Sequence, residues 1–338
     1  MKLSRLLVAP LALALSIAAP LAAQSAAQHD SAVKAAARTR ALPLPTPRPL
    51  SFTTDEASWI SLDIAPDAKT IVFDILGDLY TLPIAGGQAT RITSGTGWDQ
   101  QPRFSPDGKR IAFVSDRNGS KNVWIANADG SAPRIITRSE RINFSSPIWS
   151  ADGQYVIAAR TGQLWMYNVD GGSGVQLTGL RPEGAAGAAG TPASHYGAAP
   201  SNDPRYLWVN VSGNVPTTLA SGVELHTATS AREEAEEQAA RSNARRIGQY
   251  QIGQFDRESG RTLVRSHETF GAFRPVASPD GKWLVYATRY DAREALKLRD
   301  LATGEERWLV MDVQRDNSQG GGVNDRDLYP ASAFTPDS

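Results

Sequence analysis

From about residue 60 onward, apolar and polar residues alternate in short runs that begin at a fixed distance after an aspartate. The fourth residue after each of these aspartates is aliphatic: Ile71, Ile111, Val156, Leu207 and Leu284. The sixth is again apolar: Phe73, Phe113, Ala158, Val209 and Tyr286. An apolar residue at every second position predicts a β-strand, because successive strand side chains point to opposite faces.

The aspartate itself belongs to a repeated turn motif. Clear copies are Ile64-Ala-Pro-Asp67, Phe104-Ser-Pro-Asp-Gly108, Trp149-Ser-Ala-Asp-Gly153 and Ala277-Ser-Pro-Asp-Gly281. Pro200-Ser-Asn-Asp203 is a degraded copy, and Phe334-Thr-Pro-Asp337 begins another. Proline presets φ, aspartate bonds nearby backbone and glycine accepts positive φ, so each copy predicts a tight turn.

The second half of each repeat is also regular. Further strands are predicted at residues 78–82, 122–126 and 163–167, each followed by a glycine-containing hairpin turn and a short edge strand such as 90–93 or 134–137. Four antiparallel strands in about 40 to 50 residues are typical of a propeller blade. We therefore predict an all-β propeller over residues 50–338, with five complete blades and the start of a sixth. A β-sandwich is the main alternative, but it does not explain a turn repeated at this period.

Both ends of this repeat region suggest an incomplete ring. Ser338 follows directly after the Pro336-Asp337 turn, where a second strand is expected to begin. Residues 51–53 align with the last strand of a blade, although no earlier strands precede them. An open ring leaves a blade face and a sheet edge unpaired. The expectation is that the sequence is a fragment of a longer protein.

One repeat is longer than the others, because Asp203 and Asp280 are unusually far apart. We predict a helical insertion in the fourth blade at about residues 230–246, where Ser230 and Glu233 form a capping box. Its apolar side chains are alanines, so it is either a solvated excursion or a docking element for another domain. The low-complexity residues 184–190 predict a long loop between the third and fourth blades.

The N-terminus predicts export. Lys2 and Arg5 precede an apolar stretch at residues 6–18, and small residues follow, with cleavage expected near Ala23 or Ala27. This pattern indicates a signal peptide over residues 1–27, with a buried helix or membrane anchor as the alternatives. Residues 28–49 form an Ala/Pro-rich tether. The chain has no cysteine, hence no lipobox. The expected location is periplasmic or secreted, without a membrane anchor after cleavage.

Charge and chemistry point away from catalysis by this chain. Lysine plus arginine equals aspartate plus glutamate, which disfavours nucleic acid as a partner. The four histidines, His29, His195, His226 and His267, are far apart, and no metal-binding spacing occurs. No nucleophile elbow is present, and the glycines at 320–322 neither follow a strand nor open a helix. The turn at residues 116–119 fits hairpin chemistry better than calcium. We expect no catalytic, cofactor-binding or metal-binding residue here.

Aromatic residues are the remaining binding candidates. Trp124, Trp165 and Tyr80 occupy equivalent strand positions, which predicts packing between blades. Trp59 and Trp98 fall in connections between blades, where they either pack against a neighbouring blade or contact a ligand or partner.

At Phe104-Ser-Pro-Asp-Gly-Lys-Arg-Ile-Ala-Phe-Val-Ser-Asp-Arg117, followed by Asn122-Val-Trp-Ile-Ala-Asn-Ala-Asp-Gly130, the sequence resembles the TolB-like (WD-type) propeller repeat family. The stretches that begin at Phe52 and Ile71, and the helix from Glu233, resemble the N-terminal half of exported bacterial amidohydrolases, in which such a propeller precedes a metal-dependent hydrolase barrel.

That resemblance implies that this is the non-catalytic propeller region of a hydrolase. Its catalytic domain, with a divalent metal such as zinc, would lie beyond Ser338 and be its partner. Two alternatives stay open. One is a TolB-like periplasmic protein-binding module. The other is the propeller of a prolyl-oligopeptidase-type serine peptidase.

Overall fold

The computed structural model describes residues 52–56, 60–180, 193–212, 250–268, 271–291, 293–313 and 331–338. All of them belong to one compact unit that spans Arg48–Ser338. They contain twenty β-strands in five four-stranded antiparallel sheets, and no helix occurs among them. The predicted signal peptide, the tether and the helical insertion lie outside these ranges, so they stay predictions.

Each sheet is one blade, built from strands consecutive in sequence. The first blade contains β1 (Leu62–Ile64), β2 (Thr70–Ile75), β3 (Asp78–Pro83) and β4 (Thr90–Arg91). The second contains β5 (Asp99–Phe104), β6 (Arg110–Ser115), β7 (Asn122–Asn127) and β8 (Arg134–Ile135). The third contains β9 (Phe144–Trp149), β10 (Tyr155–Arg160), β11 (Gln163–Asn168) and β12 (Val175–Gln176).

The last two blades follow the same plan. The fourth contains β13 (Ser194–Pro200), β14 (Tyr206–Ser212), β15 (Tyr250–Asp256) and β16 (Thr262–Val264). The fifth contains β17 (Phe273–Ala277), β18 (Trp283–Tyr290), β19 (Arg293–Asp300) and β20 (Glu306–Val313). The fourth repeat is long because β14 ends at Ser212 and its partner strand β15 begins only at Tyr250, which pairs with Ser212.

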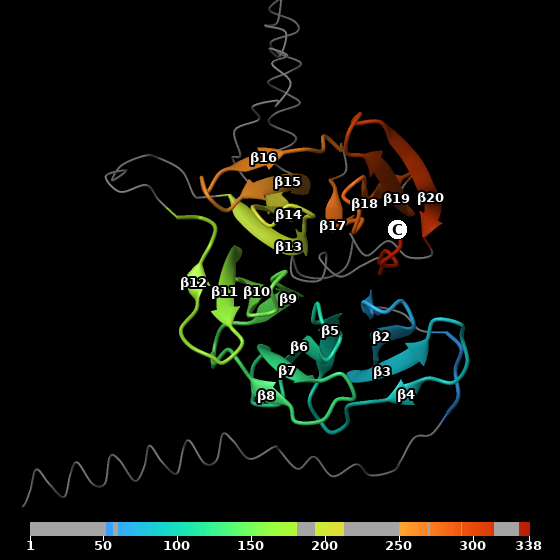
Figure 1. The fold of residues 1–338 in the computed structure, drawn as a ribbon, viewed down its shortest axis with the longest axis vertical. Coiled ribbons are helices and arrows are strands. Elements are labelled where there is room, and N and C mark those ends of the chain that lie inside the picture. The colour runs from blue at the N-terminus through green and yellow to red at the C-terminus, as the bar shows by residue number, and fades with distance from the viewer. Residues whose placement is uncertain are drawn as a thin grey trace, which may run out of the picture. The chain divides into compact units, whose positions relative to one another are not determined.

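The blades follow one another around a common axis (Figure 1). The first strand of each blade contacts the first strand of the next, from β1 through β5, β9 and β13 to β17. These five strands are therefore innermost, and they surround the channel of the propeller. The predicted fold class of five antiparallel blades is confirmed.

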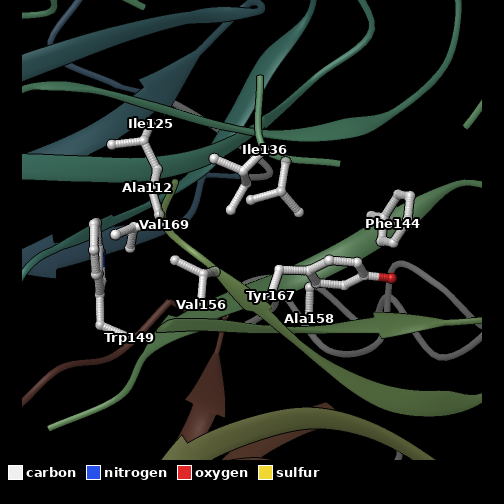
Figure 2. Close-up of a cluster of buried hydrophobic side chains, with 10 residues drawn as sticks. Ala112, Ile125, Ile136, Phe144, Trp149, Val156, Ala158, Tyr167 and Val169 are labelled. Carbon is white, nitrogen blue, oxygen red and sulfur yellow. The ribbon is translucent and has the colours of Figure 1, made fainter. Parts of the chain in front are cut away.

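The core lies between blades, because each blade buries both of its faces in different clusters. In β10, Val156 and Ala158 pack toward the second blade, whereas Ile157 and Ala159 pack toward the fourth. Figure 2 shows the first of these clusters, in which Tyr167 and Ala158 of the third blade pack together with Ile136 of the second blade. Burial of each such large side chain contributes roughly 1.5–3 kcal/mol. The period-two pattern thus serves blade-to-blade packing.

The Pro-Asp turns have the predicted geometry. The Oδ1 atom of Asp107 accepts a hydrogen bond from the backbone N–H of Lys109 at 3.1 Å, and Gly108 has a φ of 69°. The hydroxyl of Ser105 donates to Asp107 Oδ1 at 2.6 Å and accepts from the N–H of Arg110 at 3.0 Å. The same serine bonds recur at Ser150 and Ser278.

The segment at residues 331–338 begins a sixth copy of the turn. The N–H of Ser338 donates to the carbonyl of Thr335 at 2.9 Å, as the N–H of Gly108 does to the carbonyl of Ser105. At the other end, the prediction of a strand over residues 51–53 is wrong for the two described residues, 52 and 53. Phe52 and Thr53 form no strand, and Phe52 is exposed because no sheet in the described part of the chain pairs with it.

Candidate functional site

The five innermost strands converge on one cavity, and this cavity is the candidate site. It has a volume of about 290 Å³ and receives side chains from β1, β5, β9, β13 and β17. It lies at the end of the channel where the first strand of each blade turns into the second, since Pro66, Pro106, Ala151 and Pro279 all line it immediately before a turn aspartate. Clefts of this kind are common ligand and partner sites.

Four innermost strands carry a β-bulge at the same place, which gives the channel wall its shape. The bulges centre on Gln101, Ser146, Gly197 and Arg274, whose φ angles lie between 49° and 59°. Each of them lies six residues before a turn aspartate. Left-handed backbone at a non-glycine residue persists only where the surroundings impose it.

Buried polar side chains from the preceding blade hold these bulges. Asp74 accepts from the N–H of Gln101 at 3.0 Å, and Asn210 accepts from the N–H of Arg274 at 2.9 Å. The side-chain oxygen of Gln101 in turn accepts from the N–H of Ser146. Three blade-to-blade junctions therefore use the same device, a buried acceptor that satisfies the bulged N–H.

Three charged side chains reach the cavity from three different blades. Asp63 Oδ2 accepts from the N–H of Phe104 at 2.8 Å. Arg103 Nη1 donates to the carbonyls of Leu62 and Pro102 at 3.1 and 2.7 Å. Arg274 is almost fully buried, and its Nη2 donates to the carbonyl of Ser332 at 3.3 Å.

The electrostatics of these groups are coupled. Burial raises the pKa of the Asp63 carboxyl, and the positive charges of Arg103 and Arg274 oppose that rise. Among the described residues that line the cavity, two guanidinium groups face one carboxylate. The arrangement suits recognition of acidic or polar groups by fixed donors.

The chain resembles known propellers over part of its length. Residues 63–195 match the family model of the Tricorn protease N-terminal beta propeller domain. TolB of Desulfosudis oleivorans is 49% identical over 47 residues, which are 14% of this chain and 10% of that protein. Tricorn protease homolog 1 of Streptomyces coelicolor is 30% identical over 98 residues, which are 29% of this chain and 9% of that protein.

A solved structure, a putative TolB from Agrobacterium tumefaciens, superposes with a TM-score of 0.54 at 19% identity and covers 76% of this chain and 82% of that one. Repeat motif, blade plan and these matches agree. The chain is a β-propeller whose repeats resemble those of TolB. It spans only about a tenth of the length of the two curated relatives named above, so the activity of the whole protein is a matter for proposal.

The two histidines in the described part of this propeller do not form a site together. His195 is buried in the fourth blade. Its Nε2 lies 2.7 Å from the hydroxyl of Thr262 and its Nδ1 lies 3.1 Å from the carbonyl of Ala193. Because a carbonyl only accepts, Nδ1 carries the proton and Nε2 accepts from the threonine. His267 is exposed, and His29 and His226 lie outside the described residues.

The aromatic candidates mostly pack between or within blades. Trp124 packs against the cluster between the first two blades, and Trp165 against the cluster between the second and third. Tyr80 stacks on Phe73 of its own blade. Trp98 lies in the connection between the first two blades, half exposed, with Gly77 close beneath its ring. Trp59 lies outside the described residues.

Within the part of the chain that the structure describes, no three His, Asp or Glu side chains come together as metal ligands would. The same residues include no helix with the length and apolarity that a membrane crossing requires. The sequence reading missed Asp63, Arg103 and Arg274. Their only signal was their spacing of four or six residues before a turn aspartate, and that spacing has meaning only once the blades are placed in a ring.

Proposed function

We propose that this chain is the non-catalytic propeller region of an exported hydrolase, and that it contacts the catalytic domain at the end of the channel where the Pro-Asp turns lie. The observation that carries the proposal is the cavity at this end, where all five blades and residues 332–334 meet. A surface to which every blade contributes is shaped by the whole ring, and it suits a partner that covers the axis.

The chemistry of the cavity fits a protein surface. Phe104 and Trp149 supply aromatic lining, and Pro66, Pro106 and Pro279 supply rigid apolar lining. Arg103 and Asp63 add polar groups that fix orientation. Aromatic and arginine side chains are enriched at the centres of protein interfaces.

The sequence likeness supports a larger parent protein. The matching family model is described as an N-terminal propeller domain of a protease. The resemblance of residues 52–59 and 71–87 to exported amidohydrolases makes a metal-dependent amidohydrolase domain the proposed partner, in the same polypeptide and in the periplasm or outside the cell. A divalent metal such as zinc would be held by that domain, because the described residues offer no fitting set of ligands. We assign no catalytic step to this chain.

Reading the coding sequence past Ser338 tests the proposal directly. A metal-binding His-x-His strand motif supports it, and the full polypeptide should then contain divalent metal and hydrolyse amide bonds. A Gly-x-Ser-x-x-Gly elbow would replace the metal enzyme with a prolyl-oligopeptidase-type serine peptidase.

Hydrogen exchange tests the docking surface separately. In the full polypeptide, amides at residues 62–66 and 102–106 should exchange more slowly than in the 338-residue chain, whereas the exposed hairpin at residues 257–261 should not change. Equal exchange at the channel in both proteins would show that the catalytic domain docks elsewhere.

A second candidate is a TolB-like module that binds another exported protein at the same end of the channel. The local identity of 49% to TolB over 47 residues favours it. A stop codon after one further blade would support this alternative over a catalytic parent.

A further inference from the structure

A second cavity lies between the fourth and fifth blades and shares no lining residue with the channel cavity. Its volume is about 220 Å³. The lining includes Asn202, Trp208, Gln254, Arg265 and Arg299. Two guanidinium groups therefore meet in one small cavity, and no acidic side chain is among the described residues that line it.

The two arginines differ in how their charge is compensated. Arg299 Nη1 lies 2.7 Å from Glu306 Oε1, so this guanidinium has a carboxylate partner. Arg265 donates through Nε and Nη2, at 3.2 and 2.6 Å, to the neutral amide oxygen of Gln254. Among the described residues, no carboxylate forms an ion pair with Arg265, in contrast to Arg299.

The surroundings hold these charges close together. Arg299 Nη1 also donates to the backbone carbonyl of Arg265 at 2.8 Å. Partial burial, together with the charge of Arg299, lowers the pKa of Arg265. Although Glu306 compensates Arg299, an anion in the cavity would also interact favourably with the partly buried guanidinium of Arg265.

The neutral groups that line the cavity also suit an anion. The side chain of Asn202 lies against Gly281 of the fifth blade, where an added Cβ would come within 2.1 Å of the asparagine Nδ2. Gly281 therefore permits the close approach of Asn202, whose amide can donate hydrogen bonds. Trp208 is almost fully buried and closes the apolar side.

We infer that the cavity between the fourth and fifth blades binds an oxyanion, either a carboxylate or a tetrahedral phosphate or sulfate group. Arg265 supplies the main charge, Arg299 the second, and the Asn202 amide an additional donor. A guanidinium fork matches the geometry of such groups through parallel hydrogen bonds. This site is independent of the proposed contact at the channel.

Isothermal titration of the 338-residue chain with sodium phosphate, sulfate and acetate tests the inference, at ionic strength held constant with sodium chloride. Saturable binding of at least one anion is expected. Arg265→Gln should weaken it at least about tenfold, the effect of about 1.4 kcal/mol. Arg265→Lys retains the charge but not the fork, and it should weaken binding less. The preference for acetate or for phosphate identifies the class of oxyanion.

The matched control is Arg261→Gln, because Arg261 is exposed in the neighbouring hairpin and lies outside the cavity. It should bind as the unaltered chain does. Circular dichroism melts verify that each variant is folded. Equal affinity in Arg265→Gln and the unaltered chain, or no saturable binding of any of the three anions, would overturn the inference.

Discussion

The buried histidine of the fourth blade makes the stability of this propeller depend on pH. His195 has both ring nitrogens in hydrogen bonds and is only 5% exposed. Burial lowers its pKa from 6.5 to about 4, because the charged imidazolium loses its hydration. The native fold therefore favours the neutral ring. Its contribution to stability is fully present above about pH 6.5 and is lost as the pH falls through about 4.

The size of the effect follows from the two pKa values. A tenfold change in proton affinity corresponds to about 1.4 kcal/mol, so complete protonation removes about 3 kcal/mol of unfolding free energy. Between about pH 7.5 and pH 5, the expected loss from this one group is about 2 kcal/mol. Urea denaturation at both pH values measures the total change. His195→Gln, which cannot titrate, should show a pH dependence smaller by this amount.

Direct titration provides the decisive measurement. NMR spectra of the folded chain, labelled at histidine, should show no protonation of His195 above about pH 5. If the His195 ring titrated near 6.5 in the folded protein, or if His195→Gln kept the full pH dependence, the reasoning from burial would be refuted.

Five substitutions test the turns and blade junctions by urea denaturation. Asp74→Ala should lower the unfolding free energy by about 2–4 kcal/mol, because it leaves buried N–H groups of two blades without an acceptor; a loss under about 0.5 kcal/mol would contradict this. Ala68→Gly should raise the unfolding free energy by about 1 kcal/mol, because Ala68 has a φ of 58° where the other clear copies of the turn carry glycine. Gly108→Ala should lower the unfolding free energy by a similar amount. Gly130→Ala should lower the unfolding free energy more than Gly86→Ala, because an added Cβ meets the backbone of Ile92 at Gly130 and open space at Gly86. Equal losses in the two variants would argue against the close approach of Ile92 to Gly130.

The repeat determined most of the fold before any tertiary information. Aspartate at position 107 and its equivalents, followed by alternating apolar residues, located β2, β6, β10, β14 and β18 correctly, because turn chemistry and period-two alternation are local properties. The strand ends were less accurate. An edge strand is predicted over residues 90–93, but the observed strand β4 contains only Thr90–Arg91, because its length depends on pairing with β3.

The site could not be derived in the same way. Asp63, Arg103 and Arg274 are far apart in sequence, and each is unremarkable in its own strand. They share one cavity only because β1, β5 and β17 are all innermost strands of the same ring. Likewise, Arg265 and Arg299 face one another because the fourth and fifth blades pack side by side.

The sequence by itself therefore determined the blade, its turns and the alternation of its faces, since these depend on neighbours a few residues apart. Only the tertiary structure decided which charges meet and which histidine is buried. Burial and electrostatic interaction act through space across blades, and no spacing along the chain encodes them.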